Sequence, residues 1–202
     1  MQKLSLATLS TLAFTLASTN VFAVDGTITV NGVVTDQTCT LQASGNGSEY
    51  ATGLKDITVD MGAWPKSWFT PTNQSSWWFI INLYIKNADG TANCDAATIG
   101  ALKGIHLSAI SPDHLDTADK TLLVNQASGA SSTNPIFIRF RTMAYEHVDF
   151  SEPWGRQAKS GRVFMVGTDA MYLEYYVAFV SKTGVVDAQN VNAKINYTIH
   201  YN

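Results

Sequence analysis

The sequence has 202 residues, which is long enough for one domain with a buried core. Charged residues make up 14% and aromatic residues 11%, a composition that excludes a disordered chain. The net charge of −3 argues against nucleic acid or an anionic membrane surface as the main partner. We therefore expect a single globular domain with no nucleic-acid partner.

Residues 1–23 are predicted to form a secretory signal peptide. Lys3 provides the positive start, and residues 4–17 form an apolar run diluted by serine and threonine. Residues 21–23 place small or modest side chains at the cleavage positions. The apolar run is too short to span a bilayer. A buried N-terminal helix is the alternative, but the segment shows no amphipathic pattern.

The next stretch, residues 24–39, reads VDGTITVNGVVTDQTC. Ile28, Val30 and Val34 alternate with threonines, which is typical of a strand with one buried face. Gly32 keeps their phase without a side chain, and glycine weakens a strand unless another group must approach it closely. The stretch is therefore either an ordinary first strand of a sandwich with an incidental glycine, or a strand that fits a groove with one narrow point.

Cys39 and Cys94 are the two cysteines. In an exported chain an even number favours one disulfide over two free thiols. The four histidines show no spacing typical of metal ligands, so neither a metal site nor a cofactor is expected.

Strands separated by turn-rich loops are predicted along the rest of the chain. These strands are expected at 56–61, 78–86, 104–110, 121–124, 135–143, 162–166, 171–180 and 191–201, and most of them show alternating apolar and polar residues. Loops rich in glycine, serine and asparagine or containing proline are predicted at 43–53, 126–134 and 146–162. Because helical periodicity is scarce, the sequence predicts an all-β sandwich.

Residues 62–78 contain Trp64, Trp68, Trp77 and Trp78, four of the five tryptophans. Such side chains either close one end of a sandwich beneath a long loop, or stack on sugar rings at an exposed site. Their burial distinguishes the two interpretations.

Both ends of the chain resemble the subunits of chaperone–usher pili, with type 1 pilus-like pilins as the nearest group. TITVNG, followed by VV and a cysteine seven residues after the glycine, is similar to the N-terminal extension of these pilins. The closing alternating strand with Tyr201 before Asn202 is similar to their last strand. The tryptophan-rich stretch and the wide spacing of the cysteines depart from the shaft subunits, which leaves the position of the subunit in a pilus open.

The resemblance implies an incomplete immunoglobulin-like β-sandwich, the pilin fold, completed by a donor strand from a neighbouring subunit. It divides the chain into a signal peptide (1–23), a donor strand (24–36) and a pilin domain (37–202). The implied donor residues are Ile28, Val30, Gly32 and Val34. The implied acceptor-groove residues are Val191, Ala193, Ile195, Tyr197, Ile199 and Tyr201. Asp36, next in phase, departs from the small apolar residue that the family pattern predicts.

The implied function is that of a structural subunit of a fimbria, which polymerises by donor-strand exchange and serves cell adhesion. Its partners would be a periplasmic chaperone, an outer-membrane usher and neighbouring pilins, in a fimbria on the cell surface. The alternative is a single-domain adhesin, or a minor tip or adaptor subunit, that binds host carbohydrate through the tryptophan-rich loop. An enzyme is not expected, because the sequence lacks Gly-x-Ser-x-Gly, His-Glu-x-x-His and a glycine-rich phosphate loop.

Overall fold

The computed structural model describes residues 39–43 and 51–201. The predicted signal peptide (1–23) and donor strand (24–36) lie outside these residues. Within the described part of the chain, no helix is long and apolar enough to cross a membrane.

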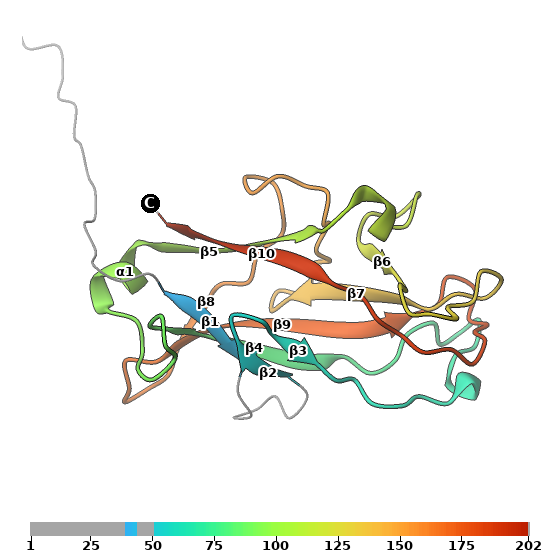
Figure 1. Cartoon of the computed structure of the whole chain (residues 1–202), viewed down its shortest axis with the longest axis horizontal. Helices are drawn as coiled ribbons and strands as arrows, with labels where there is room; N and C mark the ends of the chain where they lie inside the picture. Colours follow the sequence, from blue (N-terminus) through green and yellow to red (C-terminus); the bar gives the residue numbers. More distant parts are fainter. Residues whose placement is uncertain (1–38, 44–50, 202) are drawn as a thin grey trace, which may run out of the picture. The chain divides into compact units, whose positions relative to one another are not determined.

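Antiparallel strands form two sheets that face each other (Figure 1). The larger sheet contains β1 (Thr40–Ala43), β2 (Ala51–Leu54), β3 (Thr58–Val59), β4 (Phe79–Lys86), β6 (Leu122–Val124), β7 (Phe137–Thr142), β8 (Arg162–Phe164) and β9 (Met171–Val180). Its strand order is β3-β2-β1-β4-β9-β7-β6, with β8 paired to β9. The smaller sheet contains β5 (Leu102–Ala109) and β10 (Ile195–Tyr201). A short helix, α1 (Ala96–Ala101), and two 3-10 turns, Lys66–Trp68 and Pro112–His114, complete the described elements.

The core lies between the two sheets, because every second residue of a strand points to the same face. Alternate residues of β4 and β9 meet Ile105 and Leu107 of β5 there. The side chain of Tyr175 in β9 is buried, and this burial raises the pKa of its hydroxyl to about 12. The core-facing residues of β10, by contrast, are only half-buried, so this part of the core is incompletely covered.

Most of the predicted strands are confirmed, and β9 has the predicted bounds. The last strand is shorter than predicted: β10 begins at Ile195 rather than Val191. Ile195 pairs with Ala109, where β5 ends, so the preceding residues have no ladder partner in β5. The predicted loop 43–53 is wrong at both ends, because it overlaps the last residue of β1 and the start of β2.

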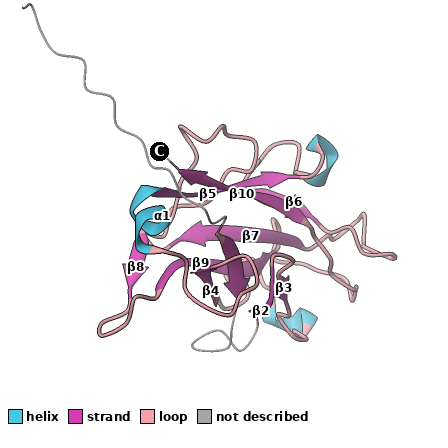
Figure 2. Cartoon of the chain, turned by 60° about the vertical axis from the view of Figure 1, so that its left-hand side comes forward, coloured by secondary structure: helices cyan, strands magenta, loops and turns pink. Residues whose placement is uncertain are grey.

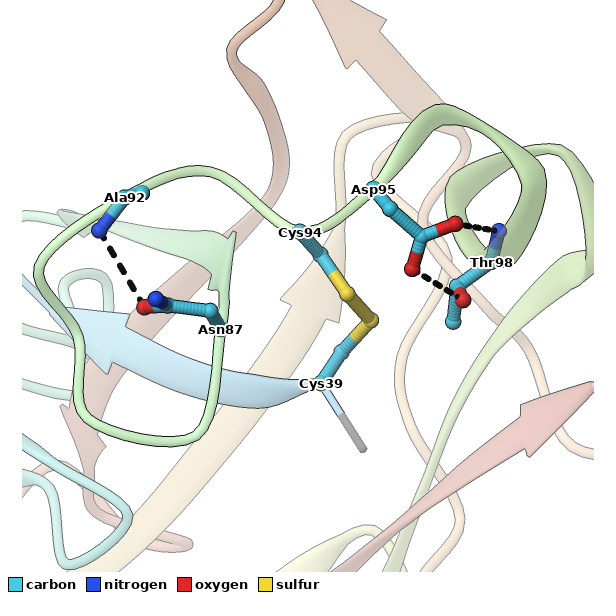
Figure 3. Close-up of a disulfide and its surroundings, with 6 residues drawn as sticks. All are labelled: Cys39, Asn87, Ala92, Cys94, Asp95 and Thr98. Atoms are coloured by element: carbon cyan, nitrogen blue, oxygen red, sulfur yellow. Dashed lines mark hydrogen bonds between the residues drawn. A yellow bond between two sulfur atoms is a disulfide. The ribbon is translucent and has the colours of Figure 1, made fainter. Parts of the chain in front are cut away.

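The predicted disulfide between Cys39 and Cys94 is present (Figure 3). The two Cα atoms are 5.7 Å apart, and the cysteines are 55 positions apart in the sequence. Cys39 directly precedes β1, and Cys94 follows the turn after β4. The side-chain oxygen of Asn87 accepts a hydrogen bond from the amide of Ala92 at 3.1 Å, which stabilises that turn. The disulfide thus ties the start of the described chain to the end of a central strand.

Asp116 is a nearly buried carboxylate that stabilises the loop between Pro112–His114 and β6. It accepts hydrogen bonds from the ammonium of Lys182 at 3.0 Å and from the backbone amides of Ala118 and Asp119. Burial raises the pKa of Asp116, but these hydrogen bonds outweigh it and hold the pKa below its ordinary value.

Asp116→Asn is expected to weaken the acid sensitivity of the fold. The native carboxylate contributes stability that is complete above its unfolded pKa of about 4 and is lost as the pH falls through the lower folded value. The variant should be less stable by about 1.5–3 kcal/mol near neutral pH, since a charged hydrogen-bond acceptor is lost. Urea unfolding near pH 7 and near pH 3 measures both effects. The exposed Asp169→Asn serves as the control, and an unchanged acid sensitivity in Asp116→Asn would contradict the assignment.

Candidate functional site: an open groove between two sheet edges

An apolar groove with a volume of about 1120 Å³ separates the edges of the two sheets. One wall is formed by residues 55–66, which follow β2 and include β3. The opposite wall is formed by residues 186–197, which lead into β10. Core side chains form the floor, among them Leu41, Ile81, Leu83, Leu107, Ile138 and Tyr175.

Both walls are free sheet edges. β3 ends the larger sheet and pairs only with β2, whereas β10 pairs only with β5. Among residues 39–43 and 51–201, no strand lies between β3 and β10. Backbone groups at such edges can pair with an added strand. The groove therefore combines two hydrogen-bonding edges with an apolar floor.

Side chains from a neighbouring loop keep the second wall extended before β10 begins. The buried Asn125 donates a hydrogen bond to the carbonyl of Asn190 at 2.7 Å and accepts one from the amide of Asn192 at 2.9 Å. The amide of Gln126 also donates to the carbonyl of Asn192 at 2.7 Å. These bonds hold residues 190–192 in place without any pairing to β5. The groove wall therefore does not depend on β5 along this stretch. The sequence analysis did not identify Asn125, because nothing in its local pattern marks this role.

The structure places four of the six predicted acceptor residues in the groove lining: Val191, Ala193, Ile195 and Tyr197. Ile199 and Tyr201 are not among the lining residues; they pack against the core further along β10. The last lining residue, Tyr197, lies beside Thr40 of β1 and Asp56 of the opposite wall. Burial, with a smaller contribution from Asp56, raises the pKa of its hydroxyl. The side chain of Tyr197 therefore marks one end of the groove.

The other end of the groove lies beside Trp64 and Trp68. Both side chains are half-buried and pack against the cluster of Phe69, Ile136 and Val186. Their indole N–H groups donate to backbone carbonyls, Trp64 to Met61 at 3.1 Å and Trp68 to Ser75 at 3.0 Å. Trp77 is different: its ring centroid lies 5.6 Å from that of Trp68, yet 69% of its surface is exposed.

Trp78 does not belong to this cluster. The guanidinium of Arg141 lies 4.0 Å from the centroid of its ring, and also contacts the rings of Tyr145 and Tyr176. The ring of His147 stacks on Trp78 at a centroid distance of 6.2 Å. Consecutive residues in an extended chain point in opposite directions, which separates Trp78 from Trp77. The four tryptophans therefore do not form one surface.

Comparisons with known proteins agree with this architecture. No protein-family model matches the sequence. The chain is 27% identical over 186 residues to the major fimbrial subunit SMF-1 of Stenotrophomonas maltophilia (strain K279a), which covers 89% of this chain and 94% of that protein. In structure it is similar to the P pilus rod subunit PapA, with a TM-score of 0.52, 19% identity, and coverage of 87% of this chain and all of PapA. It is also similar to a subunit from a chaperone–usher pilus whose structure concerns rod uncoiling, with a TM-score of 0.50, 17% identity, and coverage of 88% and 95%.

The chain has the fold of chaperone–usher pilus subunits. Its sandwich is the incomplete immunoglobulin-like fold of these subunits, and the groove between β3 and β10 is the gap that this fold leaves open.

Proposed function

We propose that this chain is a pilin of the chaperone–usher type, exported through the periplasm to an extracellular pilus. It would be a structural, non-catalytic subunit that polymerises when residues 24–36 of one copy enter the groove of the next. The observation that carries this proposal is the groove itself, with one free edge on each wall and an apolar floor. An extended segment with alternating apolar residues is the complement of such a site. Residues 24–36 have this alternation and come shortly before the first described strand, which begins at Thr40.

Strand addition accounts for both affinity and specificity at this site. Backbone groups of the inserted segment pair with residues 55–66 on one side and 186–197 on the other, while alternate side chains enter the groove. Ile28, Val30 and Val34 would each contribute about 1.5–3 kcal/mol through burial. Because donor segment and groove are different surfaces, the contact is head-to-tail and builds an open filament.

A free pilin needs protection before it polymerises. Its groove exposes apolar surface between two unpaired edges, an arrangement that promotes aggregation. We therefore propose two further partners. A periplasmic chaperone covers the groove first, and the donor segment replaces this chaperone at an outer-membrane usher.

Carbohydrate binding through the tryptophan-rich loop is not favoured. Trp64 and Trp68 are half-buried and their indole N–H groups are bound to backbone carbonyls, so neither presents an open stacking face with a free donor. Trp78 is covered by Arg141 and His147. Only Trp77 of the four is mostly exposed.

Gly32→Leu is expected to slow strand insertion. Gly32 has the phase of the residues that point into the groove, so a leucine there would overfill a packed site at a cost of about 1–3 kcal/mol. Synthetic peptides spanning residues 24–37 can be mixed with the chaperone-bound pilin, and release of the chaperone measures insertion. The substituted peptide should react roughly 5- to 150-fold more slowly.

The matched control is a peptide with Asn31→Leu, which adds the same side chain one position out of phase. It should react at nearly the unsubstituted rate. If Gly32→Leu also reacts at that rate, the groove has no narrow point there. If the unsubstituted peptide does not displace the chaperone, the donor assignment itself is wrong.

A further inference from the structure

The disulfide and the tip of the β8–β9 hairpin lie at the same end of the sandwich. Thr40, next to Cys39, pairs with Lys86 at the end of β4. Tyr84 of β4 pairs with Tyr172 near the start of β9, and Phe164 of β8 pairs with Met171. Figure 2 shows β8 beside α1 at this end. We call it the Cys39 end.

The hairpin at the Cys39 end presents apolar side chains to solvent. Phe164 is 58% exposed, Met165 is 36% exposed and Val166 is fully exposed. The guanidinium of Arg162 donates to the carbonyl of Ile99 in α1 at 3.2 Å, which fixes the base of the hairpin. An apolar surface held in place in this way indicates an interaction site rather than a loose loop.

Exposed apolar side chains also lie at the opposite end, which we call the Trp77 end. The amide of Ser76 donates to the carbonyl of Phe179 near the end of β9, so Trp77 is a strand length away from the hairpin tip. Trp64 and Trp68 contact the Trp77 ring edge-on, at centroid distances of 6.0 and 5.6 Å. Val185 is 51% exposed in the turn that follows β9. The ring of Trp77 is therefore oriented by its contacts with two other tryptophans, while most of its surface is exposed to solvent.

The two groove walls run in opposite directions. Residues 55–66 lead from β2 toward Trp64 at the Trp77 end, whereas residues 186–197 lead into β10, whose last residue, Tyr201, lies close to Cys39. A strand inserted between them is parallel to one wall and antiparallel to the other in either orientation. Pairing alone therefore does not decide at which end the inserted segment leaves the groove.

Chain connectivity decides it. Asp36, the last residue in phase with the donor positions, is three residues from Cys39, a span of at most about 10 Å. If the donor left the groove at the Cys39 end, that end of each subunit would have to contact both the preceding and the following subunit. If it leaves at the Trp77 end, each end contacts one neighbour, which is the head-to-tail arrangement of the proposed filament.

We propose that Phe164, Met165 and Val166 of one copy pack against Trp77 and Val185 of its neighbour, forming an apolar joint beside each inserted strand. This inference rests on the proposed head-to-tail polymerisation and adds a second contact to it. Both surfaces are apolar, both are anchored by their own fold, and connectivity brings the two ends together. An oriented tryptophan is the side-chain type that most often dominates such contacts.

Disulfide trapping tests the joint. A pilin with both Val166→Cys and Trp77→Cys is assembled into polymers, oxidised, and denatured completely without reductant before electrophoresis. The joint predicts a ladder of covalent oligomers that collapses to monomer when reductant is added. Val166→Cys with Met143→Cys is the matched control, because Met143 is also exposed but lies after β7, level with the middle of β9. This pair should give monomers only.

A second pair, Phe164→Cys with Val185→Cys, leaves Trp77 in place and so covers the case in which its substitution itself disturbs the protein. Trapping by either pair supports the joint. Polymers that form normally but give no ladder with either pair would overturn the joint and leave donor-strand polymerisation intact. Failure of the unsubstituted pilin to polymerise would instead refute the proposed function on which the joint rests.

Discussion

A pilin that lacks residues 24–36 is expected to lose polymerisation entirely while it keeps its folded sandwich. The core is built from residues after Cys39, and the described sheets pair without the deleted segment. The deleted residues carry the only part of the chain that we assign to a neighbouring groove. Electron microscopy and size-exclusion chromatography of the assembled material would measure the loss, and circular dichroism of the chaperone-bound subunit would report the fold.

The matched control for this deletion keeps the chain length but replaces residues 24–36 with a glycine–serine segment. It should also fail to polymerise, because it supplies a flexible tether without apolar side chains for the groove. Addition of the peptide 24–37 should fill the groove of either variant without joining subunits. Polymers formed by the deleted chain, or unfolding of its sandwich, would contradict the division of the chain at this point.

Loss of the disulfide through Cys39→Ser with Cys94→Ser is expected to lower the free energy of unfolding by about 4 kcal/mol. The bond closes a loop with a sequence separation of 55, and the estimate follows from the chain entropy that such a loop removes from the unfolded state. Urea unfolding of the peptide-filled pilin is the appropriate measurement, since an empty groove complicates the native state. The double variant is preferred to a single one, which would leave a reactive buried thiol.

A change below about 1 kcal/mol would contradict this estimate, since losses of 2–5 kcal/mol are typical when a native disulfide is removed from a small exported domain. Reduction of the unsubstituted pilin provides an independent comparison. It should bring the unsubstituted protein to the stability of the double variant and leave the double variant unchanged.

The strands that sequence predicted well are those with long alternation. β4 and β9 pair across six positions, and β9 buries every second residue along most of its length, so its pattern is set by a local rule. β10 begins four residues later than its alternation predicts, because a strand also needs a partner and β5 ends at Ala109. The alternation of residues 191–194 is nevertheless consistent with the groove, since Val191 and Ala193 line it.

The parts that the sequence could not supply depend on contacts between distant residues. Asn125 holds the second groove wall through bonds to residues more than 60 positions away, which no local pattern reveals. α1 has only six residues, too few for a helical period to stand out. Trp77 and Trp78 are neighbours in the sequence, yet their side chains belong to different clusters on the two sides of the chain.

The position of the disulfide has a mechanical consequence. Tension along a filament of such subunits would enter each sandwich through the backbone just ahead of Cys39. Without a crosslink, that tension would load the few hydrogen bonds that pair β1, a strand of four residues, with β4. The covalent bond to Cys94 transfers the load past β1 to the far side of the turn after β4, a strand paired along its length with β9. The disulfide would thus reinforce the sandwich at the point where a pulling force would arrive, and less of that force would fall on the short strand beside it.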